Sequence, residues 1–483
     1  MEVGTYGYYW VVYAAFLSLS CFVLALTRPL RAAGPYSVPY TLPFIKSTIP
    51  FVFDGFKFLR SAIQRFPYSS TIRISIFREE IYLVQGPKNV AELFRNPQIT
   101  ITRSWSLLLR QCFGMRQEAV NAYLADTSGT RHKPIPGSTP NPQDRISFMT
   151  HENLTAGILQ NGLDPATDRF KEYLEESLQT LDIGHDWAYM LDMTEFFQYH
   201  LGTALIRTLF GKGPLDQDTN FIQDLWEYDE GVMNLAQRFP RLWIPKIYRV
   251  RDKLLATVSR WHANAVNCAE TSKDDNDGEA DSIWGTKMMK ERYRTLLGAT
   301  AHDEASIRRD CRPLDDDHAI HIFRSPPLLS SLRDALSHHS PSPSIKELES
   351  VPLLISTYAE TLRFVIHIHV PFLVDPMDQS SGPTRKKKVA STEETKRNAY
   401  FSSDGLEGAW IQYGGGHHAC PGRLLAKRIM IFSAALLINN FDIEILVEEQ
   451  ALRFISPRFG FGVSKPAGPV PFRIRRRNHV YSP

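Results

Sequence analysis

The chain has 483 residues and 43% of them are hydrophobic, which is enough apolar material for a large core and excludes a wholly disordered chain. Its formal net charge of +3 excludes the strongly basic balance of a nucleic-acid-binding protein. The five cysteines are scattered singly, which excludes a secreted disulfide framework and favours a reducing compartment.

An uncharged apolar run begins the chain, from Gly7 to Leu26. A bilayer core of about 30 Å needs roughly 20 such residues in a helix. Arg28 and Arg31 follow the run and no Lys or Arg precedes it, so the positive-inside rule places the rest of the chain in the cytosol. A cleaved signal peptide is the alternative, but it would need a basic start and a shorter apolar core. We therefore expect residues 1–28 to be a single-pass membrane anchor.

A proline-rich tether over residues 29–50 is expected to separate this anchor from one globular domain over residues 51–483. Within that domain, Thr71–Phe77 alternates apolar and polar residues and predicts a strand. Glu80–Val84 predicts its hairpin partner. Gly86 and Pro87 then open a helix that is expected to run to Asn96.

Further helices are predicted after a Pro/Ser/Gly-rich loop over residues 124–144. The segments with helical periodicity are Met193–Phe210, Phe221–Gln237, Ile247–Asn267, a helix from Pro327 and Val351–Val365. The last of these places Glu360 and Arg363 three residues apart on one face, where they can form an ion pair.

The stretch from Trp410 to Arg423 (WIQYGGGHHACPGR) carries most of the chemistry. Three glycines free the backbone for tight turns, and an amphipathic helix is predicted directly after Cys420. The backbone N–H groups and positive end of that helix favour the thiolate form of Cys420. A thiolate presented in this way is a metal ligand or a nucleophile; small core filler is the alternative. A zinc site with His417 and His418 would lack a fourth ligand.

This stretch closely resembles the haem-binding loop of the cytochromes P450, an aromatic-x-x-Gly-x-x-x-Cys-x-Gly pattern. Its fixed positions are filled by Tyr413, Gly416, Cys420 and Gly422, with Tyr413 where the family usually has Phe. The resemblance implies that Cys420 is the axial thiolate ligand of haem b. It also implies that His418 binds a haem propionate.

The resemblance extends over most of the chain and implies a mainly α fold with small β-sheets. Glu360 and Arg363 match a buried family ion pair that precedes the haem loop. The C-terminal segments are most similar to the branch of sterol 7α- and 12α-hydroxylases and prostacyclin synthase, with its fungal relatives. A closing sheet is expected at the C-terminus.

The function that this resemblance implies is a haem-thiolate monooxygenase acting on a lipophilic, sterol- or terpenoid-like molecule. Electrons would come from NADPH through a cytochrome P450 reductase, which could dock on the basic face of Arg423 and Lys427. The implied location is the endoplasmic reticulum membrane, with the catalytic domain cytosolic and no nucleic-acid partner.

Two family segments look deleted. The interval Met288–Arg324, where the distal helix over the haem is expected, is charged, contains Pro313 and lacks an apolar stripe. The strands before the haem loop are also missing between Arg363 and Cys420. These departures keep two alternatives open: a haem-thiolate isomerase or dehydratase of the prostacyclin-synthase type, and a non-catalytic remnant from a mis-spliced or decayed gene.

Overall fold

The computed structural model describes residues 13, 17–18, 35–40, 45–77, 79–96, 99, 101–271, 280–281, 283–300, 322–323, 325–340, 342–365, 405–448, 452, 454–455 and 465–478. The chain divides into two compact units. One comprises residues 1–93 and 405–410, and the other residues 94–404 and 411–483. No helix among the described residues is long and apolar enough to cross a membrane. The predicted anchor lies, except for Tyr13, Leu17 and Ser18, outside those residues.

The first unit is a small sheet with helices. Its elements are β1 (Tyr36–Ser37), α2 (Thr48–Phe53), α3 (Gly55–Arg65), β2 (Thr71–Ile76), β3 (Glu79–Val84) and the first part of α4 (Pro87–Arg95). The sheet order is β1-β2-β3, with β1 parallel and β3 antiparallel to β2. Ile72 and Ile74 are fully buried on one face of β2, together with Ala62 of α3. The alternation predicted for this strand is therefore confirmed.

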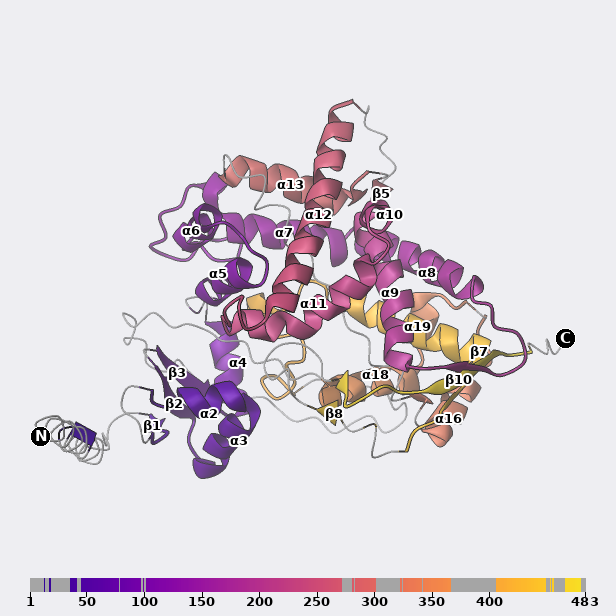
Figure 1. The fold of residues 1–483 in the computed structure, drawn as a ribbon, viewed down its shortest axis with the longest axis horizontal. Helices are drawn as coiled ribbons and strands as arrows, with labels where there is room; N and C mark the ends of the chain where they lie inside the picture. The colour runs from indigo at the N-terminus through magenta and orange to yellow at the C-terminus, as the bar shows by residue number, and fades with distance from the viewer. Residues whose placement is uncertain are drawn as a thin grey trace, which may run out of the picture. The chain divides into compact units, whose positions relative to one another are not determined.

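The second unit is mainly helical (Figure 1). Its helices are α5 (Thr102–Gln111), α6 (Gln117–Ala125), η1 (Pro142–Asp144), α7 (Ile146–Ile158), α8 (Leu163–Gln179), α9 (Met193–Phe210), α10 (Gly213–Gln217), α11 (Phe221–Ala236), α12 (Pro245–Thr271), α13 (Lys287–Thr300), α16 (Pro326–Leu336), α17 (Ile345–Glu349), α18 (Pro352–Val365), η2 (Gly416–His418) and α19 (Arg423–Asn440).

Three small sheets complete the second unit. Their strands are β4 (Ala188–Met190), β5 (Ala280–Asp281), β6 (Gly285–Thr286), β7 (Phe441–Ile445), β8 (Phe454–Ile455), β9 (Lys465–Pro466) and β10 (Phe472–Arg476). The sheet with the order β4-β10-β7 is antiparallel throughout, and two-stranded ladders join β5 to β6 and β8 to β9. The strand β10 confirms the closing sheet expected at the C-terminus, and the mainly helical fold with small sheets is the one that the resemblance implies.

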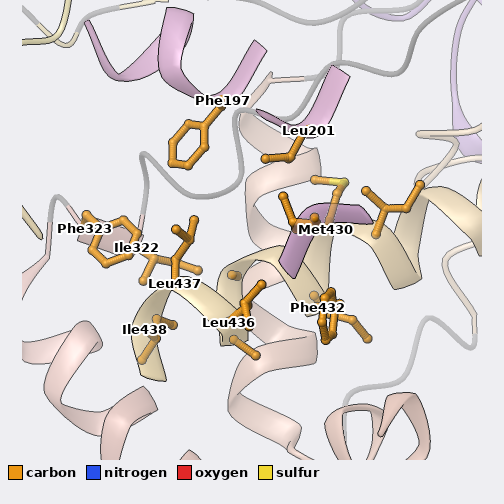
Figure 2. Close-up of a cluster of buried hydrophobic side chains, with 14 of the residues drawn as sticks. Phe197, Leu201, Ile322, Phe323, Met430, Phe432, Leu436, Leu437 and Ile438 are labelled. Atoms are coloured by element: carbon orange, nitrogen blue, oxygen red, sulfur yellow. The ribbon is translucent and has the colours of Figure 1, made fainter. Parts of the chain in front are cut away.

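The helix α19, directly after the cysteine, lies in the main core. Every residue from Met430 to Ile438 is buried, because helices and strands surround this segment. Figure 2 shows Phe197 and Leu201 of α9 pointing toward α19, with Ile322 and Phe323 near Leu437. Burial of this kind contributes about 1.5–3 kcal/mol for each large apolar side chain. The start of α19, and the cysteine before it, are thereby held at a fixed place.

The interval expected to hold the distal helix is described only in part. Its first portion forms α13, which packs along α7: Asn153 Nδ2 donates to Thr295 Oγ1 at 2.9 Å, and Met288 fills the space beside Gly157. At its other end, Ile322 and Phe323 are buried in the main core. Pro313 and the acidic residues from Asp315 to Asp317 lie outside the described residues.

Most helices predicted from periodicity are confirmed within three residues at each end. The helices from α5 to α8, however, are not foreseen by the sequence analysis. The clearest case is α7 (ISFMTHENLTAGI), whose apolar residues lie on all sides. It lacks a single stripe because α6, α8 and α13 pack around it.

Candidate functional site

The cysteine loop forms a tight turn that ends at the start of α19. The Cys420 N–H donates to the Tyr413 carbonyl at 2.8 Å, and the Gly414 N–H donates to the Ile411 carbonyl at 2.8 Å. Gly422 is the N-cap of α19, two residues after the cysteine. Cys420 is half-buried. The predicted position of Cys420 at the mouth of a helix is confirmed.

Two glycines of the loop allow the chain to pass close to Phe94, at the end of α4. Gly416 has a φ of +57°, and a Cβ atom added to it would lie 2.2 Å from the Phe94 carbonyl oxygen. A Cβ added to Gly415 would lie 2.7 Å from the Phe94 ring. Only glycine fits at both positions without a shift of the backbone, which is the physical reason for the glycine run.

The tyrosine that replaces the usual phenylalanine has a partner. Tyr413 and Tyr358 of α18 share a hydrogen bond between their hydroxyl groups at 2.9 Å. Burial raises the pKa of Tyr358, and the neighbouring Tyr413 raises it further, so the Tyr358 hydroxyl stays protonated at physiological pH. The hydroxyl of Tyr413 therefore ties the cysteine loop to α18, a contact that phenylalanine could not make.

The predicted ion pair on α18 is present but exposed. Arg363 donates to both carboxylate oxygens of Glu360, at 2.8 and 2.7 Å. Their side chains are 54% and 55% exposed, whereas the family resemblance implies a buried pair. An exposed pair of this kind contributes less than about 1 kcal/mol because water screens it. Residues 366–404, which follow it in the chain, lie outside the described part of the structure.

The structure describes the contacts of His417 but not the side chain of His418. The side chain of His418 is not among those that the structure describes, so its role as a propionate ligand stays a prediction. His417 is held by a neighbouring segment: Thr130 Oγ1 donates to its carbonyl at 3.5 Å, and Arg131 Nη2 lies 3.1 Å from its Nδ1. A guanidinium is only a donor, so this His417 nitrogen accepts the hydrogen bond.

The helix α7 reaches the same loop from another side. Ile158 Cδ1 lies 3.6 Å, and the Cys420 Sγ atom 3.8 Å, from the point where a Cβ on Gly422 would stand. Burial lowers the pKa of His151; the charge of Arg423 lowers it further, whereas Glu152 raises it. The half-buried imidazole of His151 is therefore neutral at pH 7. The sequence analysis missed both residues because it found no apolar stripe in α7.

The basic residues at the start of α19 make contacts within the protein. Arg423 Nη1 donates to the Cys420 carbonyl at 3.0 Å, and Lys427 forms an ion pair with Glu349 at 3.0 Å. Lys427 is half-buried and its charge is balanced by Glu349. The basic face that the resemblance implied for a reductase is thus partly neutralised.

The donor set of the loop suits haem. Within the described part of the chain, no three side chains of His, Cys, Asp or Glu come together where they could hold a metal ion, so those residues offer no zinc site. One thiolate on a glycine-rich turn can supply the single protein ligand that a haem iron needs, since the porphyrin supplies four nitrogens. The residues of the cysteine loop therefore fit a haem.

Known proteins similar to this chain include fungal cytochrome P450 monooxygenases. The chain is 24% identical to the cytochrome P450 monooxygenase efuG of Hormonema carpetanum, over 93% of this chain and 91% of that protein. It is 23% identical to the cytochrome P450 monooxygenase fsoE of Humicola fuscoatra, over 94% of this chain and 89% of that protein. Prostacyclin synthase of Rattus norvegicus is 31% identical over 27% of this chain and 33% of that protein. No family model matches the chain.

The alignment with the Hormonema protein contains gaps on the side of this chain. It spans 527 positions but covers 93% of the 483 residues, about 449, so about 78 positions (527 − 449) of the relative have no counterpart here. A surplus in the relative is what a deletion in this chain would produce. Similarity over about nine tenths of its length to two such enzymes, together with the cysteine loop, supports a relationship to the cytochrome P450 monooxygenases, whose cofactor is haem.

Proposed function

We propose that this protein is a haem-thiolate monooxygenase that inserts one oxygen atom of dioxygen into a lipophilic small molecule. The observation that carries the proposal is Cys420, half-buried on a hydrogen-bonded glycine turn at the start of α19. The similarity to fungal monooxygenases over most of the chain supports the same reaction class.

The residues of the loop have distinct tasks in this proposal. Haem, when bound, supplies the redox chemistry of oxygen activation. Cys420 would bind the haem iron, and the hydrogen bond from the Cys420 N–H to the Tyr413 carbonyl fixes the backbone that presents the thiolate. The positive end of α19 stabilises the negative sulfur. His418 is proposed to bind a propionate.

The decisive experiment replaces Cys420 by alanine. Reduced protein with carbon monoxide should show the red-shifted Soret band of a thiolate ligand, and Cys420→Ala should lose that band. Cys268→Ala is the matched control, because Cys268 is an exposed cysteine on α12 and should be irrelevant to ligation. A band that persists in Cys420→Ala would disprove the assignment.

The finer features of the function are also proposals. We propose a sterol- or terpenoid-like substrate, electrons from NADPH through a membrane-bound cytochrome P450 reductase, and attachment to the endoplasmic reticulum membrane. They follow from the family and from the apolar run Gly7–Leu26. The test is substrate-dependent NADPH oxidation with purified reductase present.

A second candidate reaction is favoured by one observation. The match to rat prostacyclin synthase, at 31% identity over part of the chain, is compatible with a haem-thiolate isomerase or dehydratase that needs neither dioxygen nor a reductase. Turnover of a hydroperoxide or endoperoxide without NADPH would support this reaction over monooxygenation. Strict dependence on both NADPH and reductase would exclude it.

A further inference from the structure

Two buried charged residues outside the cysteine loop, Asp126 and Arg145, share one hydrogen-bonded network. Their side chains belong to residues that are only 2% and 7% exposed. A buried charge is costly unless hydrogen bonds and an opposite charge compensate for the lost water. Such a network fixes the backbone that it contacts, since each broken bond would leave a buried charge partly unsatisfied.

Asp126 joins the segment after α6 to the start of α7. Its Oδ1 accepts from the Ser128 N–H at 3.0 Å and from the Ser128 hydroxyl at 2.6 Å. Its Oδ2 accepts from the Ser147 N–H at 2.8 Å, in the first turn of α7. A carboxylate at this end of a helix also interacts favourably with the helix dipole.

Arg145, the N-cap of α7, binds the same segment from the other side. Its Nε donates to Ser128 Oγ at 3.1 Å, its Nη1 donates to the His132 carbonyl at 2.8 Å, and its Nη2 donates to the Arg131 carbonyl. The guanidinium also lies over the Phe148 ring, 4.3 Å from its centre. Two of these donors thus hold the backbone carbonyls of Arg131 and His132, and the third holds the side chain of Ser128.

The held segment carries the two side chains that contact the cysteine loop. Thr130 and Arg131 lie between the anchored residues Ser128 and His132, and both reach His417. His417 stands three residues before Cys420. At the other end of α7, Ile158 packs beside Gly422. The segment before α7 therefore contacts the loop ahead of the cysteine, and the end of α7 contacts it after the cysteine.

We propose that Arg145 is a positioning residue for the haem-binding loop: it holds residues 128–132 so that Thr130 and Arg131 fix His417, and with it the backbone that presents Cys420. The proposal rests on the proposed haem ligation by Cys420. It does not depend on the distal side of the haem, because every contact lies among described residues of α7, its preceding loop and the cysteine turn.

The first test measures amide hydrogen exchange without haem. Arg145→Gln should raise the exchange rate of the peptide covering residues 411–422 at least tenfold. Arg131→Gln should raise it as well, by a smaller factor; Arg131 is exposed, so its replacement leaves the core intact. The control is Arg251→Gln, since Arg251 is a part-buried arginine whose recorded hydrogen bonds go to Gln111 and Asp252.

The second test follows ligation after haem is added. Both variants should lower the share of reduced, carbon monoxide-bound protein with the thiolate Soret band, and Arg251→Gln should not. A parent protein that binds haem but shows no such band would refute ligation by Cys420, and the exchange result would then test the positioning role of Arg145 by itself. Unchanged exchange over residues 411–422 in both variants would overturn the proposal, as would an equal rise throughout α8 and α9.

Discussion

His200 is a buried titratable residue that makes the stability of the fold depend on pH. It lies on α9, is 7% exposed, and shares a hydrogen bond of 2.8 Å between its Nδ1 and Ser177 Oγ. Burial lowers the pKa of His200 from 6.5 to about 4. The folded state disfavours the protonated ring of His200. The contribution of the neutral ring to the free energy of unfolding is therefore fully present above pH 6.5 and is lost as the pH falls toward 4.

The expected loss is about 3 kcal/mol in the free energy of unfolding between these two pH values. Urea unfolding at pH 7.5 and pH 4.5 measures it. Because carboxylates titrate in the same range, the informative quantity is the difference between the parent and His200→Gln. The variant should be less stable at pH 7.5 and should lose less on acidification. Parallel pH profiles would show that His200 does not cause the effect.

The hydroxyl pair Tyr358–Tyr413 is a second residue-scale feature with a measurable energy. Tyr413→Phe restores the usual family residue but removes the hydrogen bond of 2.9 Å to α18. We expect each single change to phenylalanine to cost about 1 kcal/mol. A double-mutant cycle of Tyr358→Phe and Tyr413→Phe should give a coupling energy of about 0.5–1.5 kcal/mol. Strictly additive losses would mean that the two hydroxyl groups do not stabilise each other.

At the scale of whole elements, Arg476 of β10 binds the C-terminal end of α8, although the two elements are far apart in the sequence. Its Nη2 donates to the carbonyls of Leu178, Gln179 and Leu181 at 3.2–3.3 Å, and its Nε donates to the Ile183 carbonyl at 2.9 Å. The last carbonyls of a helix lack partners within it, and a cation there also stabilises the helix dipole. One side chain thus joins α8 to the C-terminal sheet.

Arg476→Gln should lower the free energy of unfolding by about 2 kcal/mol, because several carbonyls lose a charged donor. The midpoint of urea unfolding measures this. The matched control is Arg475→Gln on the same strand; Arg475 is 40% exposed and pairs with Asp442 at 3.1 Å. Water screens that pair, so the control should cost less than 1 kcal/mol. Equal losses in the two variants would argue against a specific role at the end of α8.

For the molecule as a whole, haem binding and catalytic activity depend on the distal helix and the strands that look deleted from the sequence. Oxygen activation needs a walled pocket that excludes bulk water, and the distal helix normally supplies it. The interval that should hold it includes Pro313 and three consecutive aspartates from Asp315, which cannot lie as an apolar helix against a porphyrin. The gaps against the Hormonema relative agree with a deletion. We therefore expect this chain to bind haem poorly and to show little NADPH-driven turnover.

The test expresses the 483-residue chain beside a version with the missing segments restored. Haem stoichiometry and substrate-dependent NADPH oxidation with reductase present are the two measurements. The restored version should bind more haem per chain and oxidise NADPH faster in the presence of substrate. Full haem loading with coupled turnover by the shorter chain would refute the prediction, and would give a role to residues in the interval Met288–Arg324.

The membrane anchor is a prediction at the same scale. Residues Gly7–Leu26 should keep the chain in carbonate-washed membranes, and protease added outside microsomes should digest its bulk. Asn153-Leu154-Thr155 is a glycosylation sequon, but its modification is a weak reporter of topology. It lies in α7, where Asn153 is bonded to Thr295 and Thr155 is buried. A glycosylation site engineered before Gly7 is the better control. Modification there would support an N-terminus outside the cytosol, and protection of the bulk of the chain would contradict the expected topology.

The sequence by itself predicted the cysteine turn and several of the helices, among them α9 and α11. Local rules suffice there: glycines permit the turn near Phe94, and apolar periodicity marks amphipathic helices such as α11 and α16. The same rules gave the strands β2 and β3.

Only the tertiary structure decided which distant side chains meet at the turn. Tyr358, Arg131 and Ile158 reach it from three separate segments, and no spacing along the chain encodes such contacts. The helix α7 was missed because it is packed on several sides and so has no single apolar stripe. The exposure of Glu360 and Arg363 was likewise beyond the sequence, since burial depends on what packs over a helix face and not on the face itself.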